Sequence, residues 1–185
     1  MRKWLILVFI LFCTSCSTMQ SRTIDGVDVS HLSADELYKT GNQYAKGTGV
    51  PQNYVTAVAY YQRAAKMGNS NAADSLGVRY LLGQGVKQDN GKARMWFERA
   101  ARKNNSYAEN QLGFMYSSGK GVPQNYETAL MWYKRAADHG LASAQYNLGL
   151  MYANGVGTPV DKVKAAEYFK MAADSGFLPA KNAME

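Results

Sequence analysis

The sequence predicts an all-α protein whose helices form repeated pairs, as in an α-solenoid. Three observations favour this architecture: a 36-residue repeat without insertions, helical spacing of the apolar residues in each unit, and glycines where helices should end. Shifting the segment Leu112–Gly140 by 36 residues in either direction places it on a similar segment. The same step connects two sets of residues, which are Gly41, Gly77, Gly113 and Gly149, and Tyr44, Tyr80, Tyr116 and Tyr152.

The chain divides into a leader, a linker and the repeat array. Residues 1–15 are predicted to be a signal peptide, because two basic residues precede the apolar run Trp4–Phe12 and small residues follow it. That run is too short to span a bilayer, which needs about 20 apolar residues. Residues 16–33 are polar and lack helical periodicity, so we expect a flexible tether there. The array then occupies residues 34–185.

The end of the leader carries a lipidation signal. Its residues Cys13, Thr14, Ser15 and Cys16 resemble the lipobox of bacterial lipoproteins, although Cys13 stands where Leu is usual. The resemblance implies lipidation of Cys16; ordinary signal-peptide cleavage or a retained anchor is the alternative. By resemblance to lipoprotein sorting, Ser17 in place of Asp favours the outer membrane. We therefore expect the chain in the bacterial cell envelope, lipid-anchored and facing the periplasm, at the outer rather than the inner membrane.

Composition excludes several kinds of site. The two cysteines lie at the leader, so the mature chain has no pair of thiols for a disulfide, although the compartment is oxidising. His31 and His139 occur in unrelated contexts, so the sequence predicts no metal site and no cofactor. Loss of Arg2 and Lys3 lowers the formal net charge from +7 to +5, and no five like charges follow one another. We therefore expect no nucleic-acid binding.

The first helix of each repeat is marked at both ends. Ser33 and Glu36 have the spacing of a capping box, which predicts the first helix of the array from Ser33 onwards. A G-x-G pair, such as Gly83 and Gly85, is predicted to end each first helix. A phosphate-binding loop is disfavoured, because the pair recurs in every unit, follows a helix and lacks the G-K-[ST] ending. The repeats and a C-terminal stub are placed at 36–71, 72–107, 108–143, 144–179 and 180–185.

The second helix of each repeat is predicted to begin at an Asn or Asp N-cap. These caps are Asn53, Asp89, Asn125 and Asp161. Behind each cap, aromatic residues alternate with alanines, a spacing typical of closely packed helices rather than of a ligand site. In the second repeat they are Ala93, Trp96, Phe97, Ala100 and Ala101. A left-handed residue is expected to end each second helix, at Gly68, Asn104, Gly140 and Gly176.

The combined pattern A-x-x-x-L-G-x-x-Y-x-x-G-x-G-V-x-x-[DN]-x-x-x-A-x-x-[WY]-[FY]-x-x-A-A closely resembles the Sel-1-like repeat, a relative of the tetratricopeptide repeat. The resemblance covers residues 36–179. The first copy departs from it, with Glu36 and Thr40 where the others have Ala and Leu, as expected of a terminal repeat. The resemblance implies a right-handed α-solenoid of four two-helix repeats that binds proteins. The sequence does not resemble the cysteine-rich branch of the family, for which β-lactamase or penicillin-binding activity was suggested.

Two sets of residues are candidates for binding a partner. The first faces away from the packing positions of the first helices: Asp74, Val78, Leu82, Asn110, Phe114, Tyr146 and Leu150. Five of these are apolar and are expected to form a continuous exposed patch, unless the curvature of the solenoid buries them against the next repeat. The second is the series Arg63, Arg99 and Arg135, which either binds carboxylates or phosphates of a partner or is a duplicated surface residue.

The predicted function is a non-enzymatic protein-protein interaction module. No acid, base or nucleophile breaks the repeat pattern in a convergent way, so we expect no catalytic residues. The partner is expected to be a periplasmic protein, either a secreted effector or a regulatory protein, and the chain a monomer. By resemblance to some Sel-1-like lipoproteins, an immunity protein that neutralises a type VI secretion phospholipase effector is one hypothesis. The alternatives are a periplasmic regulator or assembly factor that binds a sensor or secretion component, and peptidoglycan or glycan binding or hydrolase-like activity.

Overall fold

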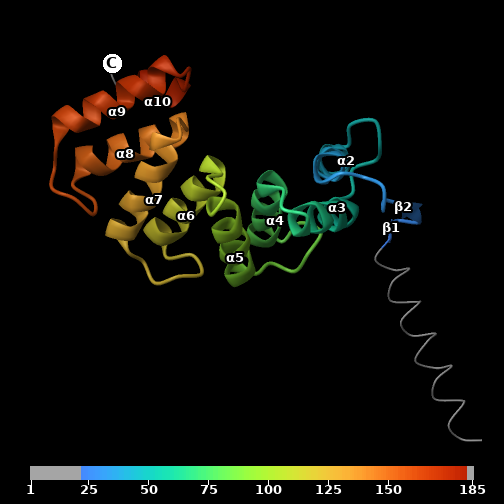
Figure 1. The fold of residues 1–185 in the computed structure, drawn as a ribbon. Helices are drawn as coiled ribbons and strands as arrows, with labels where there is room; N and C mark the ends of the chain where they lie inside the picture. The colour runs from blue at the N-terminus through green and yellow to red at the C-terminus, as the bar shows by residue number, and fades with distance from the viewer. Residues whose placement is uncertain (1–21, 183–185) are drawn as a thin grey trace, which may run out of the picture.

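The computed structural model describes residues 22–182, which form an array of antiparallel helix pairs (Figure 1). The helices of the four pairs are α2 (Ala34–Lys46) with α3 (Tyr54–Lys66), α4 (Ser70–Leu82) with α5 (Asn90–Ala101), α6 (Ser106–Ser118) with α7 (Tyr126–Asp138), and α8 (Ala142–Asn154) with α9 (Lys162–Asp174). The short helix α10 (Leu178–Asn182) follows them, and the strands β1 (Thr23–Ile24) and β2 (Val27–Asp28) precede them. The predicted all-α solenoid is confirmed.

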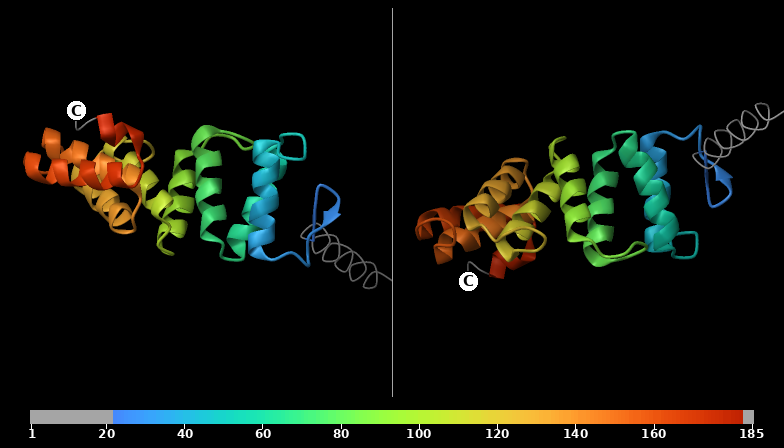
Figure 2. Two further views of the ribbon diagram at one scale, coloured as in Figure 1. Left: turned by 90° about the horizontal axis from the view of Figure 1, so that it is seen from above. Right: turned by 90° about the horizontal axis from the view of Figure 1, so that it is seen from below.

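The pairs stack in chain order. Within a pair the two helices pack along each other, and the second helix of each pair packs on the first helix of the next. The result is an elongated molecule whose two ends lie far apart, as both views in Figure 2 show. In such an array each unit is stabilised by its neighbours rather than by one central core.

The predicted N-caps form as local hydrogen bonds. Ser33 and Glu36 make a capping box at the start of α2. The side chains of Asn53, Asp89, Asn125 and Asp161 accept backbone N–H groups at the starts of α3, α5, α7 and α9. Two further caps, Asn69 and Asn105, do the same for α4 and α6. Their amides also donate to the preceding first helix, at Asp35 and Asn71 respectively.

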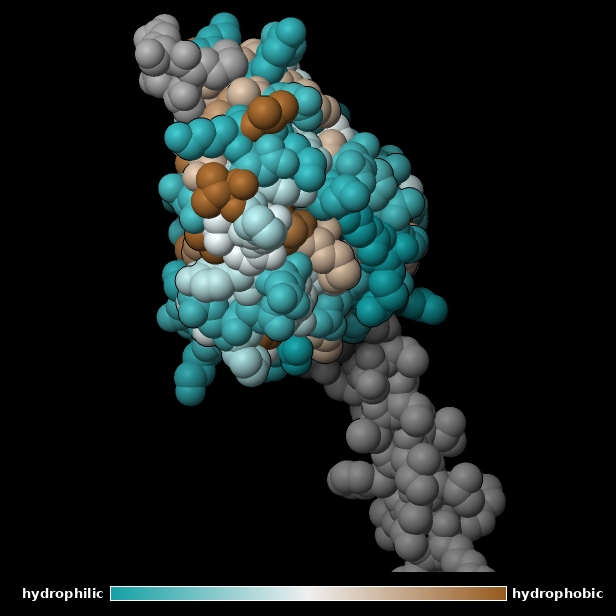
Figure 3. Space-filling model, turned by 90° about the vertical axis from the view of Figure 1, so that its left-hand side faces the viewer, coloured by the Kyte–Doolittle hydropathy of each residue, from teal (hydrophilic) through white to brown (hydrophobic). Residues whose placement is uncertain are grey.

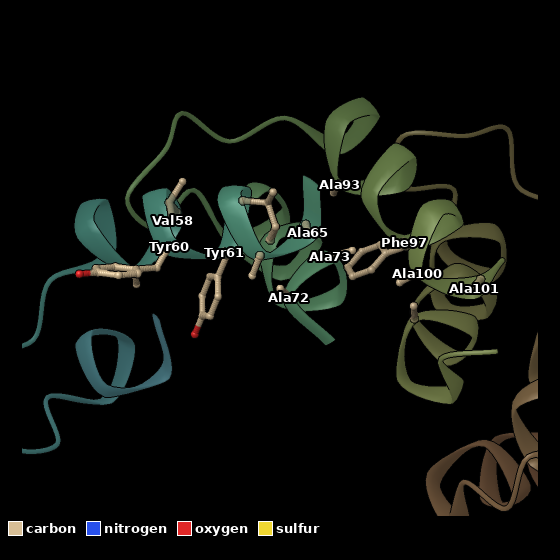
Figure 4. Packing of buried hydrophobic residues seen from close by; sticks show 14 of the residues in the cluster. Val58, Tyr60, Tyr61, Ala65, Ala72, Ala73, Ala93, Phe97, Ala100 and Ala101 are labelled. Atoms are coloured by element: carbon tan, nitrogen blue, oxygen red, sulfur yellow. The ribbon is translucent and has the colours of Figure 1, made fainter. Parts of the chain in front are cut away.

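The glycines of each first helix make room for an aromatic ring. A Cβ atom added at Gly77 would lie 2.6 Å from the ring of Phe97, closer than real Cβ atoms approach a ring. Phe97 reaches from α5 towards α4 and is fully buried, with small alanines nearby (Figure 4). The same contact recurs in the other repeats, between Gly41 and Tyr61, Gly113 and Tyr133, and Gly149 and Phe169.

The second glycine of each G-x-G pair has a different role from the first. The first ends the helix in a left-handed conformation, as Gly83 does with φ 68°. The second lies against the first turn of the preceding repeat's second helix: a Cβ at Gly121 would lie 2.6 Å from that of Asn90. Gly85 approaches the backbone carbonyl of Tyr54 in the same way. Gly49, in the first repeat, has no atom within 4 Å of its added Cβ.

Residues 22–33 are folded onto the first helix pair. β1 and β2 pair in antiparallel register, Thr23 opposite Asp28, and β1 contacts α3. Val29 is 0 % exposed and belongs to the main core. This corrects the prediction of a flexible tether for this part of the chain, because apolar residues here cover the end of the array, which would otherwise be open. The predicted signal peptide and Cys16 lie outside the described residues.

Candidate partner-binding face

The seven predicted partner-binding residues lie on α4, α6 and α8, and we call this surface the first-helix face. Three of its apolar side chains are exposed: Leu82 is 56 % exposed, and Phe114 and Leu150 are each 37 % exposed. Phe114 and Leu150 occupy the same position of neighbouring repeats. The ammonium group of Lys120 lies 5.3 Å from the centroid of the Phe114 ring, so a positive charge borders this apolar surface.

The apolar patch is not continuous. Val78 is half-buried and packs on the main core. Tyr146 lies between two rings, with its centroid 5.5 Å from that of Phe169 and 5.4 Å from that of Phe177. At the α8–α9 end of the molecule, apolar residues appear as separate brown areas among polar ones (Figure 3). The prediction of a continuous patch is wrong at these two positions, because the second helix and the turn before α10 reach over the first helix.

The polar residues of the first-helix face have different surroundings. Asn110 accepts a hydrogen bond of 3.1 Å from the side-chain amide of Asn147, which connects α6 to α8. Asp74 has one carboxylate oxygen, Oδ1, that is buried and has no hydrogen-bond partner within residues 22–182. Burial raises the pKa of Asp74 to about 7, since removal from water disfavours the charged form. A buried carboxylate oxygen without a hydrogen-bond partner is costly, so the charged form of Asp74 destabilises the free chain.

An ion-pair cluster that the sequence analysis did not find lies between α6 and α7. Glu109 is fully buried, and its carboxylate oxygens lie 2.7 Å from Arg135 Nε and 2.7 Å from His139 Nδ1. We call these three residues the Glu109 cluster. Arg135 also donates to the backbone carbonyl of Ala101 at 2.7 Å. Arg135, whose side chain is 41 % exposed, therefore connects its repeat to the preceding one.

A signal for the Glu109 cluster was present in the sequence. Glu109 occupies a repeat position that holds Leu37, Ala73 and Gln145 in the other units, so it breaks the repeat pattern. The Glu109 carboxylate forms ion pairs with Arg135 and His139, so the cluster connects α6 to the C-terminal end of α7.

The part of the chain that the structure describes lacks two further features, a metal-binding cluster and a membrane-spanning helix. No group of three or more His, Cys, Asp or Glu side chains is arranged to hold a metal ion there. Over the same residues, no helix has both the length and the apolar character needed to cross a membrane.

Comparison with known proteins identifies the repeats. The Sel1 repeat profile matches residues 37–69, 70–105, 106–141 and 142–177. The chain belongs to the Sel1 repeat family. The resemblance inferred from the 36-residue pattern is confirmed, and Sel1 repeat arrays are protein-interaction modules.

Two solved structures are similar over most of the chain. One is c5321, a protective antigen of uropathogenic Escherichia coli strains with an SLR fold, at 35 % identity and a TM-score of 0.75. It matches 80 % of this chain and 32 % of its own. The other is a Sel1 repeat protein from Oxalobacter formigenes, at 34 % identity and a TM-score of 0.77, with 80 % of this chain and 60 % of that one covered. The Sel1 chain thus spans less than two thirds of either protein.

A more distant likeness is to an immunity protein. The immunity protein Pa5087 from Pseudomonas aeruginosa is 21 % identical, with a TM-score of 0.44, and the match covers 80 % of this chain and 67 % of that one. At this distance the likeness carries no argument about function. A comparison with curated proteins finds no match.

Proposed function

We propose that this Sel1 repeat chain is a lipid-anchored module of the bacterial envelope that binds a periplasmic protein through its first-helix face. The observation that carries the proposal is the exposure of Phe114 and Leu150 at one repeat position of neighbouring helices. Exposed large apolar side chains on adjacent elements are typical of interaction surfaces. Leu82, on the preceding first helix, extends the set of exposed side chains to a third repeat.

The chemistry of this face describes the partner. Burial of an aromatic or aliphatic side chain contributes about 25 cal/mol for each Å² removed from water, so Phe114, Leu82 and Leu150 favour an apolar surface on the partner. The structure thus supports a partner whose surface is apolar opposite these three side chains.

Replacement of Phe114 by aspartate is expected to abolish partner binding without unfolding the chain. The new charge would have to be desolvated in the complex, whereas in the free protein it reaches water at a position that is 37 % exposed. The measurement is recovery of a stoichiometric partner with the full chain from gently solubilised envelopes. The helical circular dichroism signal and the melting temperature should stay close to those of the parent.

The matched control for this experiment is Met131→Asp. Met131 is also a large apolar residue, 57 % exposed, but it lies on α7 and outside the first-helix face. We expect this variant to recover the partner as the parent does. If both variants lose the partner, or if Phe114→Asp unfolds, then the first-helix face is not the binding surface.

The anchor is supported by the leader sequence. We expect Cys16→Ser to release the chain from membranes into the soluble periplasmic fraction, because serine cannot carry the thioether-linked lipid. Fractionation and metabolic fatty-acid labelling measure this directly, with the parent as control. Since Arg22 follows Cys16 by six residues, an anchored chain would hold the hairpin β1–β2 within about 20 Å of the lipid. Equal fractionation of parent and variant would contradict the anchor.

The identity of the recovered partner separates the roles that are compatible with this module. A secreted phospholipase effector supports the immunity hypothesis, whereas a sensor or a secretion component supports a regulator or assembly factor. Co-sedimentation with purified sacculi in the absence of any protein partner would instead support peptidoglycan binding.

A further inference from the structure

A small cavity lies where the C-terminal end of α3, the N-terminal end of α4 and the last turn of α5 meet. Its volume is about 190 Å³, and Ala73, Arg99 and Lys103 form part of its wall. At about 30 Å³ for each water, this volume corresponds to roughly six water molecules, which is enough for a carboxylate group and one or two carbons. The cavity shares no residue with the first-helix face.

Comparison with the next repeat shows that a carboxylate group occupies the equivalent of this cavity there. Three of the wall residues have equivalents 36 residues later in the Glu109 cluster: Ala73 corresponds to Glu109, Arg99 to Arg135, and Lys103 to His139. In the later repeat the space is filled by the carboxylate of Glu109, held at 2.7 Å by each of its two partners. In the earlier repeat the methyl group of Ala73 leaves the space open.

The two cationic side chains lie at the cavity wall, and both are also exposed to solvent. The guanidinium of Arg99 lies 5.4 Å from the Trp96 ring, as that of Arg135 lies 5.5 Å from Trp132, so the two arginines have the same support. Lys103 Nζ donates a hydrogen bond of 2.8 Å to the carbonyl of Gly68, which fixes the ammonium beside the cavity.

The two cations at this cavity form no ion pair with residues 22–182, because the ion pairs there include neither Arg99 nor Lys103. The N-terminal turn of α4, with Asn69 and Ser70 in the cavity wall, adds partial positive charge. A planar carboxylate fits a guanidinium well, and Arg135, the equivalent of Arg99 in the next repeat, binds the carboxylate of Glu109.

We propose that this cavity binds a carboxylate group from outside the chain, in the place that Glu109 occupies one repeat later. The site is independent of the proposed partner-binding face. Its ligand is either a small carboxylic acid or a carboxylate carried by a polypeptide, and both present the same planar group to Arg99 and Lys103.

The test is an NMR titration of the isotope-labelled full chain with sodium acetate at constant ionic strength, with sodium chloride as the reference. We expect saturable shifts of the Gly68, Ser70 and Ala73 amides and of the Arg99 side-chain N–H, with half-saturation at roughly millimolar acetate, as for a ligand of few atoms. Inorganic phosphate should bind several-fold more weakly. N-acetyl-dialanine and its amide distinguish the sources: tighter binding of the acid than of acetate indicates a polypeptide carboxylate, and equal binding a small acid.

Two variants and a control make the titration decisive. Arg99→Gln should raise the half-saturating acetate concentration at least tenfold, and Ala73→Glu should abolish the shifts by supplying an internal carboxylate. Arg102→Gln, which removes an exposed charge at the end of the same helix, should leave the titration unchanged. The proposal is overturned if acetate gives no saturable shifts, if Arg99→Gln leaves them unaltered, or if phosphate binds more tightly than acetate. Phe114→Asp should not affect this titration, so the two proposals fail separately.

Discussion

Gly85→Ala is expected to destabilise the array by roughly 2–4 kcal/mol, and Gly49→Ala by only about 1 kcal/mol. Both glycines have a left-handed backbone, with φ 74° and 75°, so an alanine costs about 1 kcal/mol at either position. At Gly85 the new Cβ would also overlap the backbone carbonyl of Tyr54, which has little room to move, and overpacking of this kind costs a further 1–3 kcal/mol or more. At Gly49 the space is open.

The measurement is urea and thermal unfolding of both variants, followed by circular dichroism. For a domain of this size, a loss of 1 kcal/mol lowers the melting temperature by about 2–4 °C. We therefore expect Gly85→Ala to melt roughly 10 °C below the parent and Gly49→Ala only a few degrees below it. If the two variants lose the same stability, then the left-handed backbone alone accounts for the effect of Gly85→Ala, and the close contact with Tyr54 contributes nothing.

Asp74→Asn is expected to stabilise the chain at neutral and higher pH. The pKa of Asp74 is raised from 3.8 to about 7 in the folded state, so the folded chain binds this proton more tightly than the unfolded chain. The free energy of unfolding should therefore fall as the pH rises from about 4 to about 7 and then level off. At 1.36 kcal/mol for each pKa unit, the loss above pH 7 is about 4 kcal/mol. Asparagine carries no charge at any of these pH values.

The comparison is between pH profiles of urea unfolding for the parent and the variant. Near pH 4 the two should have similar stability, and above pH 7 the variant should be more stable by up to about 4 kcal/mol. Asparagine is the residue at the equivalent position of the next repeat, Asn110, so the substitution is compatible with the helix. Parallel profiles would mean that the Asp74 carboxylate is well solvated.

This pH dependence also bears on function. A carboxylate that costs stability in the free protein is retained most readily where a partner uses it. If Asp74→Asn is more stable than the parent but binds the partner more weakly, then the charge of Asp74 lowers stability and contributes to binding at the first-helix face. If the variant binds the partner as well as the parent does, then only the apolar side chains of the first-helix face contribute to binding.

The helices and their ends were predictable because the interactions that define them are local. An N-cap such as Asn125 accepts its hydrogen bond from Thr128, three residues away, and nearby residue types therefore report it. The same holds for the left-handed residues at helix ends, such as Asn104 with φ 56°. Repetition strengthened each of these predictions, since every unit gives an independent copy of the same pattern.

The exposure of the side chains on the first-helix face was predicted less well. The helical wheel correctly separated Leu82, Phe114 and Leu150 from the core, but it treated each helix as if only its own partner covered it. Tyr146 is covered in addition by Phe177, which lies beyond the end of α9. The β1–β2 hairpin was missed because two-residue strands show no periodicity.

The sequence by itself determined the repeat length, the helix ends and the family of this protein, because each depends on residues within one unit. Tertiary structure alone decided which residues join the units. The hydrogen bond from Arg135 to Ala101, the contact of Gly85 with Tyr54 and the cavity beside Arg99 all depend on how one helix pair packs on the next. Those contacts connect residues some 30 positions apart, and their geometry follows from packing between hairpins, which no local sequence pattern records.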